Sequence, residues 1–194
     1  MALRRKREIA AAEQEFFEVF WYMCQIFMKK RIETGRANVS AGIWKASLST
    51  EEELREKYGG NILLPKDDFE CGMINGKLSA LHWALGKDWN FLDESLWEKR
   101  RTAMRQEWEL LDAQYEYCDR IWFGRNSKII LNDKGEEIFI PRVEGGDIGM
   151  IELLLERYGE DKLVVNDDFE WGVWSGRLSA LRWILGDEWD FLDT

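Results

Sequence analysis

Apolar and polar residues recur along most of this chain with the period of an α-helix. Residues 5–34 contain no proline, are rich in Ala, Glu, Lys and Met, and predict one long helix. Residues 35–50 are rich in Gly, Ser, Ala and Asn and predict a loop. Thr50 and the three glutamates after it predict the start of a short helix, which two glycines end after Tyr58.

The rest of the chain predicts four further helices and one β-hairpin. Two runs of β-branched and aliphatic residues flank the turn Asn-Asp-Lys-Gly within residues 128–141, which predicts a small accessory hairpin. The fold class is therefore mainly α. The four helices are predicted over residues 67–85, 96–122, 149–158 and 167–185.

An internal repeat at a constant offset of 100 residues is the strongest signal in the sequence. Residues 51–94 match residues 151–194 without a gap, and 23 of the 44 aligned pairs are identical. The match is densest between residues 67–93 and 167–193, where 17 of 27 pairs agree. We therefore expect a duplicated helical unit whose two copies pack as a pseudo-symmetric pair around one core.

The repeat divides the chain into two helical halves, residues 1–97 and 98–194, and the hairpin is an insertion in the second half. Upstream of the repeated helix, the aromatic stretch 16–27 aligns with residues 110–121 at an offset of 94. We expect the two halves to pack together as a single globule.

Both copies of the repeated helix carry small residues on one face. Gly72, Gly76 and Ala80 lie four residues apart, and the same three residues recur 100 positions later. An interior glycine costs a helix about 1 kcal/mol relative to alanine, so these positions need a neighbour that approaches closely. We expect a tryptophan ring or the other copy there, in preference to a ligand groove. The pairs Asn75/Ser175 and Lys77/Arg177 lie off this face and are expected to be exposed.

The charge of the chain narrows its classes of partner. The net charge is −10, and residues 98–194 contribute most of it, with 13 basic and 22 acidic residues. Direct nucleic-acid binding is not expected from such a chain, because attraction to phosphates dominates that binding. The basic run at residues 4–7 is interpreted as a solvated helix start. The apolar stretch 16–28 is too short to span a bilayer, and no signal-peptide pattern is present, so we expect a cytoplasmic protein without membrane contact.

Several types of catalytic site have no signature in the sequence. Cys24, Cys71 and Cys118 are too far apart for a Cys-x-x-Cys site. The single histidine, His82, is replaced by Arg182 in the other copy and is expected at a solvated or rim position. There is no P-loop, no dinucleotide-binding glycine motif, no His-Glu-x-x-His and no nucleophile elbow. These observations favour a non-catalytic protein without a cofactor.

A duplicated Asp-Asp-x-Glu motif opens the two copies of the repeated helix. Acidic clusters of this kind can bind Mg²⁺ or Mn²⁺, which keeps an all-α metal-dependent phosphohydrolase as an alternative function. Aspartate and glutamate are also the preferred residues at any helix start, so we expect helix caps and no metal site. The residues concerned are Asp67, Asp68, Glu70, Asp167, Asp168 and Glu170.

Tryptophan is unusually abundant, with 11 residues. Trp83 and Trp89 recur 100 positions later, which favours a place in the core. Trp171 and Trp174 have no tryptophan counterpart in the other copy and are therefore the candidates for contact with a partner. We expect a binding or adaptor subunit that presents an acidic, tryptophan-rich surface to another protein with a basic surface. A further alternative is an acidic mimic of nucleic acid that inhibits a DNA- or RNA-binding enzyme.

Overall fold

The computed structural model of the chain describes residues 2–35, 52–53, 56–57, 65–90 and 103–189. It is mainly helical, with one small antiparallel sheet. The helices are α1 (Lys6–Glu33), α3 (Asp68–Ala84), α4 (Glu107–Asn126), α5 (Ile148–Tyr158) and α6 (Asp168–Ile184), and the strands are β1 (Ser127–Leu131) and β2 (Glu137–Pro141).

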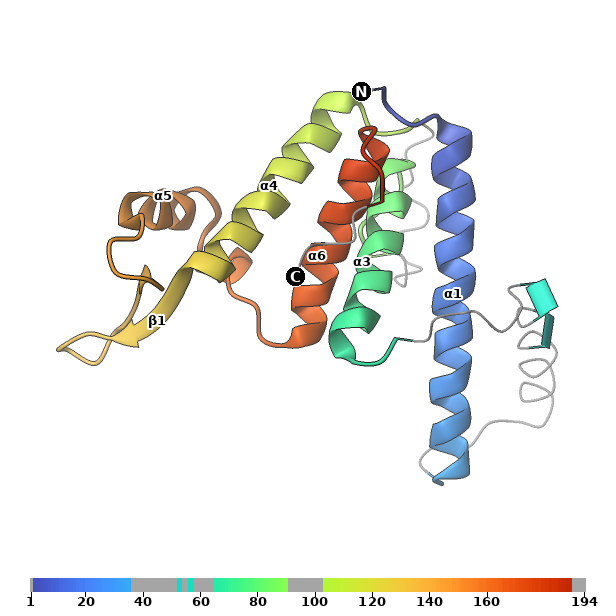
Figure 1. Cartoon of the computed structure of the whole chain (residues 1–194), viewed down its shortest axis with the longest axis horizontal. Coiled ribbons are helices and arrows are strands. Elements are labelled where there is room, and N and C mark those ends of the chain that lie inside the picture. The colour runs from blue at the N-terminus through green and yellow to red at the C-terminus, as the bar shows by residue number, and fades with distance from the viewer. Residues whose placement is uncertain (1, 36–51, 54–55, 58–64, 91–102, 190–194) are drawn as a thin grey trace.

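Four helices lie in a row in the order α1, α3, α6, α4 (Figure 1). Helix α1 packs against α3, α4 packs against α6, and the central pair α3 and α6 share the most extensive contact. The main core fills the space between these helices and includes Leu81, Leu110 and Leu181, each with 0% exposure. The two central helices therefore each bury more than one face, as their sequence pattern predicts.

The helices α3 and α6 cross at their glycines with almost no separation between their backbones. An added Cβ on Gly76 would collide with the Val173 carbonyl oxygen, and one on Gly176 would collide with the Met73 carbonyl oxygen. A Cβ on Gly72 would lie 3.0 Å from the Cα of Gly172. Contacts advance along both helices together, so the helices run parallel. The predicted close neighbour is therefore the other repeated helix, and not a tryptophan ring or a ligand.

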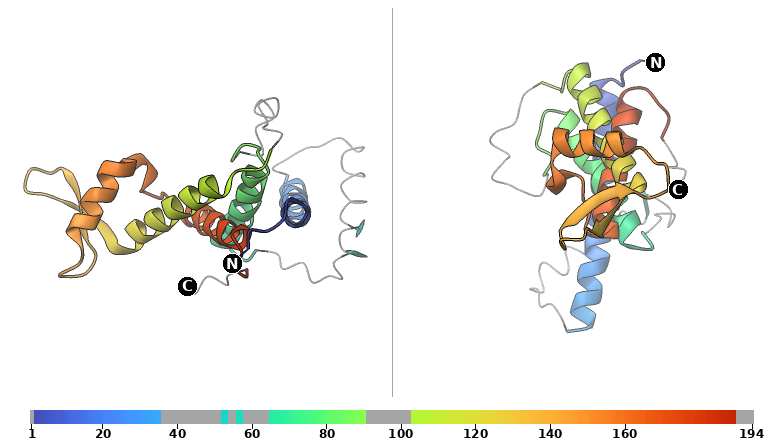
Figure 2. Two further views of the ribbon diagram at one scale, coloured as in Figure 1. Left: turned by 90° about the horizontal axis from the view of Figure 1, so that it is seen from above. Right: turned by 90° about the vertical axis from the view of Figure 1, so that its left-hand side faces the viewer.

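The second half of the chain extends into a lobe beside the four-helix row (Figures 1 and 2). Strand β1 continues directly from α4 and pairs with β2, with Ile129 opposite Phe139 and Ile130 opposite Ile138. Helix α5 packs against β2, and a second small core forms around Phe123, Ile151, Leu154 and Leu163. The predicted hairpin and the predicted helix 149–158 are both confirmed.

The predicted helix 96–122 is wrong at its beginning. Residues 103–106 are not helical, and α4 begins at Glu107 and continues to Asn126. The cause is a tertiary contact, because the Arg105 backbone N–H donates to the carbonyl oxygen of Ala84 (2.9 Å) instead of joining a helix. The predicted loop 35–50, and Thr50 and Tyr58 at the ends of the predicted short helix, lie almost wholly outside the described residues.

Matching contacts at the two ends of the row relate α1 to α4. The Arg4 N–H donates to the Ile184 carbonyl oxygen (2.8 Å) as the Arg105 N–H does to that of Ala84. In the same way, the Arg5 N–H donates to the Glu8 carboxylate and the Gln106 N–H donates to the Glu109 carboxylate. The equivalent residues 4 and 105, 5 and 106, and 8 and 109 are each 101 positions apart in the sequence. Extended along the two helices, this spacing places residue 16 opposite residue 117. The predicted alignment at an offset of 94 places residue 16 opposite residue 110 and does not agree with these contacts.

The expected exposure of two residue pairs on the repeated helices is also wrong. Ser175 is buried, with 2% exposure, and Asn75 is partly buried. Lys77 and Arg177 are partly buried as well. Each of α3 and α6 has another helix on both of its sides. Polar side chains on these sides are therefore buried or partly buried.

The glycine crossing predicts the effect of adding one methyl group. We expect Gly76→Ala and Gly176→Ala to destabilise the protein by roughly 1–3 kcal/mol, because the methyl meets backbone that cannot move aside without separating the helices. The matched control is Gly149→Ala in α5, where the nearest atom is 3.6 Å away and helix propensity should stabilise by roughly 0.4–1 kcal/mol. Chemical denaturation measures all three. A stabilised Gly76→Ala variant would refute the close crossing.

Candidate binding site

The duplicated acidic motifs begin the helices α3 and α6. The Asp67 carboxylate accepts a hydrogen bond from the Glu70 N–H (2.8 Å), and the Asp167 carboxylate accepts one from the Glu170 N–H (2.8 Å). The Glu70 and Glu170 carboxylates accept hydrogen bonds from the backbone N–H groups of residues 66 and 166. Each acidic motif therefore provides acceptors for N–H groups at the start of its own helix. Asp67 and Asp167 are caps as predicted. Asp68 and Asp168 are the first helical residues and do not cap.

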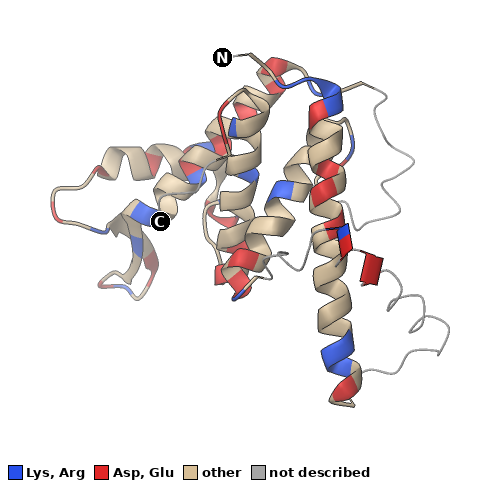
Figure 3. Ribbon diagram, turned by 45° about the vertical axis from the view of Figure 1, so that its right-hand side comes forward, with Lys and Arg blue, Asp and Glu red and all other residues tan. Residues whose placement is uncertain are grey.

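The part of the chain that the structure describes contains no cluster of side chains that could bind a metal ion. No three Asp, Glu, His or Cys side chains converge there in a way that could hold an ion. Acidic residues are spread over several helices and the hairpin instead of covering one face (Figure 3).

The two tryptophans predicted to contact a partner lie in different surroundings. Trp174 is in the main core, with 4% exposure, and the Arg120 guanidinium lies over its ring at 5.4 Å. Trp171 is partly exposed, and its ring rests on Gly124, where a Cβ would be 2.7 Å from the ring. Only Trp171 therefore presents surface to solvent, and partner contact there stays a prediction.

The repeated tryptophans form two matching stacks between cations. Trp83 and Trp89 stack with ring centroids 4.4 Å apart, and the guanidinium groups of Arg105 and Arg177 lie over their outer faces at 4.8 and 4.9 Å. In the other stack, Trp183 and Trp189 are 4.6 Å apart, with Arg4 over Trp183 and Lys77 over Trp189. Each tryptophan pair is held by cations from the opposite half of the chain, so these rings join the halves.

The hydroxyl group of Ser79 connects the Trp83–Trp89 stack to α3 by hydrogen bonds. The Ser79 hydroxyl donates to the Trp89 carbonyl oxygen (2.7 Å) and accepts from Arg177 (3.2 Å). The corresponding Ser179 is fully buried, and its hydroxyl oxygen has no hydrogen-bond partner among the described residues. The two equivalent serines thus differ in what their hydroxyl groups contribute.

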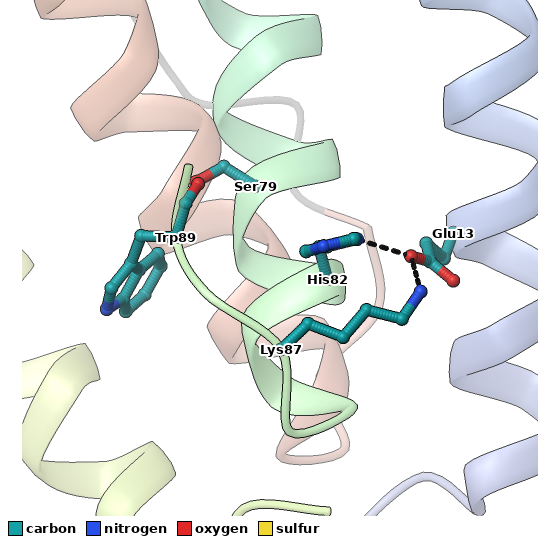
Figure 4. Close-up of polar contacts among 5 residues, drawn as sticks. All are labelled: Glu13, Ser79, His82, Lys87 and Trp89. Carbon is teal, nitrogen blue, oxygen red and sulfur yellow. Dashed lines mark hydrogen bonds and ion pairs between the residues drawn. The ribbon is translucent and has the colours of Figure 1, made fainter. Parts of the chain in front are cut away.

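His82 occupies an interior position, which corrects the expectation of a solvated one. Its Nδ1 lies 2.7 Å from a Glu13 carboxylate oxygen, and Lys87 contacts the same oxygen at 2.5 Å (Figure 4). Burial alone would raise the pKa of Glu13, but the hydrogen bonds and charges of His82 and Lys87 outweigh it and lower the pKa. This cluster joins α1 to α3.

The three cysteines are poor nucleophiles in this structure. Burial raises the pKa of each thiol, and neighbouring carboxylates raise the pKa of Cys71 further. A thiol with a raised pKa stays protonated at neutral pH, so none is an activated thiolate.

The hairpin and α5 carry a concentration of exposed apolar side chains that the sequence pattern did not identify. Leu131 and Val143 are each 66% exposed. The sequence predicts an accessory hairpin. Its two runs of aliphatic residues, in a hairpin too small to bury them, could have indicated an exposed apolar surface. The exposed large apolar residues of this lobe are Ile129, Ile130, Leu131, Ile138, Val143, Ile148 and Leu153.

Two adjoining hollows lie where the lobe meets the helical row. A cavity of about 290 Å³ is lined by both strands, the end of α4 and residues 163–165. A neighbouring hollow of about 330 Å³ reaches Trp171 and the start of α6, and both hollows share Gly124 and Val165. Small-molecule sites are concave and mostly apolar, which describes the first hollow.

No protein-family model, curated protein or solved structure matches this chain. None of the described helices combines the length and apolar character needed to cross a bilayer.

The contrast between the two serines gives a matched test of the tryptophan stacks. We expect Ser79→Ala to destabilise the protein by about 1–2 kcal/mol, because it removes the described partner of the Trp89 carbonyl oxygen and of the Arg177 Nε. Ser179→Ala should be neutral or stabilising, because the hydroxyl it removes is buried without a described partner. Denaturant titrations of both variants check this. Equal losses would contradict the assigned role of Ser79.

The Glu13 cluster predicts a dependence of stability on pH. A folded-state pKa lowered below the usual value of about 4.3 stabilises the folded state above that pH, and the contribution is lost as pH falls through the lowered pKa. Glu13→Gln should therefore be less stable than wild type at pH 7, with the gap closing on acidification. Glu15→Gln, at an exposed position of the same helix, is the control and should show no such gap. Urea titrations from pH 7 to pH 3 measure it.

Proposed function

We propose that this chain is a non-catalytic binding subunit that docks a partner protein on the outer face of its hairpin lobe. The exposed aliphatic residues of the lobe carry the proposal, because large exposed apolar patches mark interaction sites on folded proteins. We propose this surface in place of the tryptophan-rich one expected from the sequence, since Trp174 is buried and the repeated tryptophans stack between the two halves of the chain.

The form of the hairpin supports a strand-addition mode of binding. A two-stranded sheet is marginal alone, and β1 carries three consecutive aliphatic residues, 129–131, after its single charged residue, Lys128, and contains no proline. An extended partner segment added to such an edge gains main-chain hydrogen bonds, while Ile130 and Ile138 offer apolar contacts on one face. The net charge of −10 favours a partner segment with basic flanks.

The chemistry of the interior also supports binding over catalysis. The capping role of Asp67 and Asp167 uses the carboxylates on which the phosphohydrolase alternative depends, and the scattered acidic residues offer no continuous surface for a nucleic-acid mimic. Burial raises the pKa of each of the three thiols, and the His82 ring contacts the Glu13 carboxylate.

We propose further that the chain is a duplication with pseudo-two-fold symmetry about the α3–α6 crossing. The identical bounds of α3 and α6 at an offset of 100, and the matching contacts of Arg4 and Arg105, support this arrangement. Within it, the hairpin lobe follows α4 and belongs to the second half (Figure 1).

Site-specific photocrosslinking in the native cell tests the docking surface. A photoreactive residue at Leu131, which alternation places on the opposite face of β1 from Ile130 but beside the same strand edge, should form protein adducts with a segment added to that edge. Ile130→Lys with Ile138→Lys should abolish these adducts without changing the unfolding free energy by more than about 0.5 kcal/mol, since both side chains are exposed. A photoreactive residue at Trp108 is the control, because it is 63% exposed at the opposite end of α4. Adducts at Trp108 but not at Leu131 would overturn the proposal.

A further inference from the structure

The cavity of about 290 Å³ on the inner side of the hairpin combines an apolar wall with two cations. Phe123, Ile129, Phe139 and Leu163 supply most of the apolar wall, and Ser127 turns its hydroxyl away from the space by donating to the Phe123 carbonyl oxygen (2.7 Å). Among the residues that the structure describes, Arg142 and Lys128 are the charged ones that line the cavity. A cavity of this size suits a small ligand.

Two hydrogen bonds hold the exposed Arg142 side chain at the cavity, and its other N–H groups have no described protein partner. Its Nη2 donates to the carbonyl oxygens of Gly124 and Ser127, both at 3.2 Å, and both residues line the same space. No described residue accepts a hydrogen bond from its Nε or Nη1, and no described carboxylate forms an ion pair with Arg142 or Lys128. A fixed guanidinium with unused donors is a preorganised site for an anion.

We propose that this cavity binds a small carboxylate with an apolar body, with the carboxylate on Arg142 and the body against the phenylalanines. The protein as a whole is acidic, with a net charge of −10. At this cavity, however, two cationic side chains lie beside apolar residues and form no described ion pair. The cavity and the exposed aliphatic residues of the lobe share Ile129, but Ile130 and Ile138 lie on the opposite face of the hairpin from it. Register places Ile129 and Phe139 on the inner face of the hairpin and Ile130 and Ile138 on the outer face.

Titration calorimetry with octanoate, octylammonium and 1-octanol tests this site on the intact wild-type chain. These probes share a chain length and differ in charge. Octanoate should bind one site, and octylammonium and 1-octanol should each bind at least about tenfold more weakly, which is the effect of one charge-assisted hydrogen bond. Equal binding of octanoate and 1-octanol, or no saturable octanoate binding, would overturn the proposal.

Variants assign the anion contact to its residues. Arg142→Gln should weaken octanoate binding about tenfold or more, and Lys128→Gln should weaken it less, because a lysine offers an anion a single flexible point charge and not a planar pair of donors. Lys134→Gln in the exposed hairpin turn is the matched control and should bind as wild type does. If Arg142→Gln fails to fold, the wild-type probe series still decides. Ile130→Lys with Ile138→Lys should retain octanoate binding, so the cavity and the docking surface can fail independently.

Discussion

The close crossing of α3 and α6 is the constraint on which the rest of the molecule depends. Where the glycines meet, the two backbones touch without intervening side chains, so the axes of the two helices are fixed relative to each other. The flanks of this pair then define the positions of α1 on one side and α4 on the other. Four glycines are unfavourable for helix formation in isolation, and the packing gained at the crossing has to offset that loss.

The tryptophan stacks hold the ends of α3 and α6 in place, beyond the glycine crossing. A crossing of small residues leaves the ends of the two helices free to splay, and it is at these ends that Trp83 and Trp183 lie. Each ring packs on a second tryptophan and under an arginine that precedes the outer helix of the other half. Four of the tryptophans in this chain therefore join its two halves from within.

The sequence identified the helices of the repeat to within one residue, because Asp67 and Asp167 are strong caps and Gly86 and Gly186 adopt positive φ after the helix ends. It also identified the hairpin from its β-branched runs. It did not place residues 103–106, since local composition favours a helix there and only the contact of Arg105 with α3 prevents it.

The candidate site was less predictable than the fold. Periodicity shows that a face is apolar, but it does not show whether another element covers that face. Ser175 and His82 look solvent-facing by residue type and are enclosed by neighbouring helices. The aliphatic hairpin looks like core by residue type and lies at the margin of the molecule. The cavity at Arg142 depends on residues 40 apart in sequence, which no local pattern brings together.

The exchange of contacts between the two halves has a consequence for how the chain acquires its structure. Arg4 bonds to residues 183 and 184, a separation of 179 residues or more, although the fold is built from helices that form locally. During synthesis α1 can form early, but the contacts that seat its first turn do not exist until the end of α6 has emerged from the ribosome. Loop closure over that distance slows the final step relative to an ordinary helical bundle. Until then α1 and α3 expose apolar surface, and this interval is the period in which nascent chains depend on chaperones.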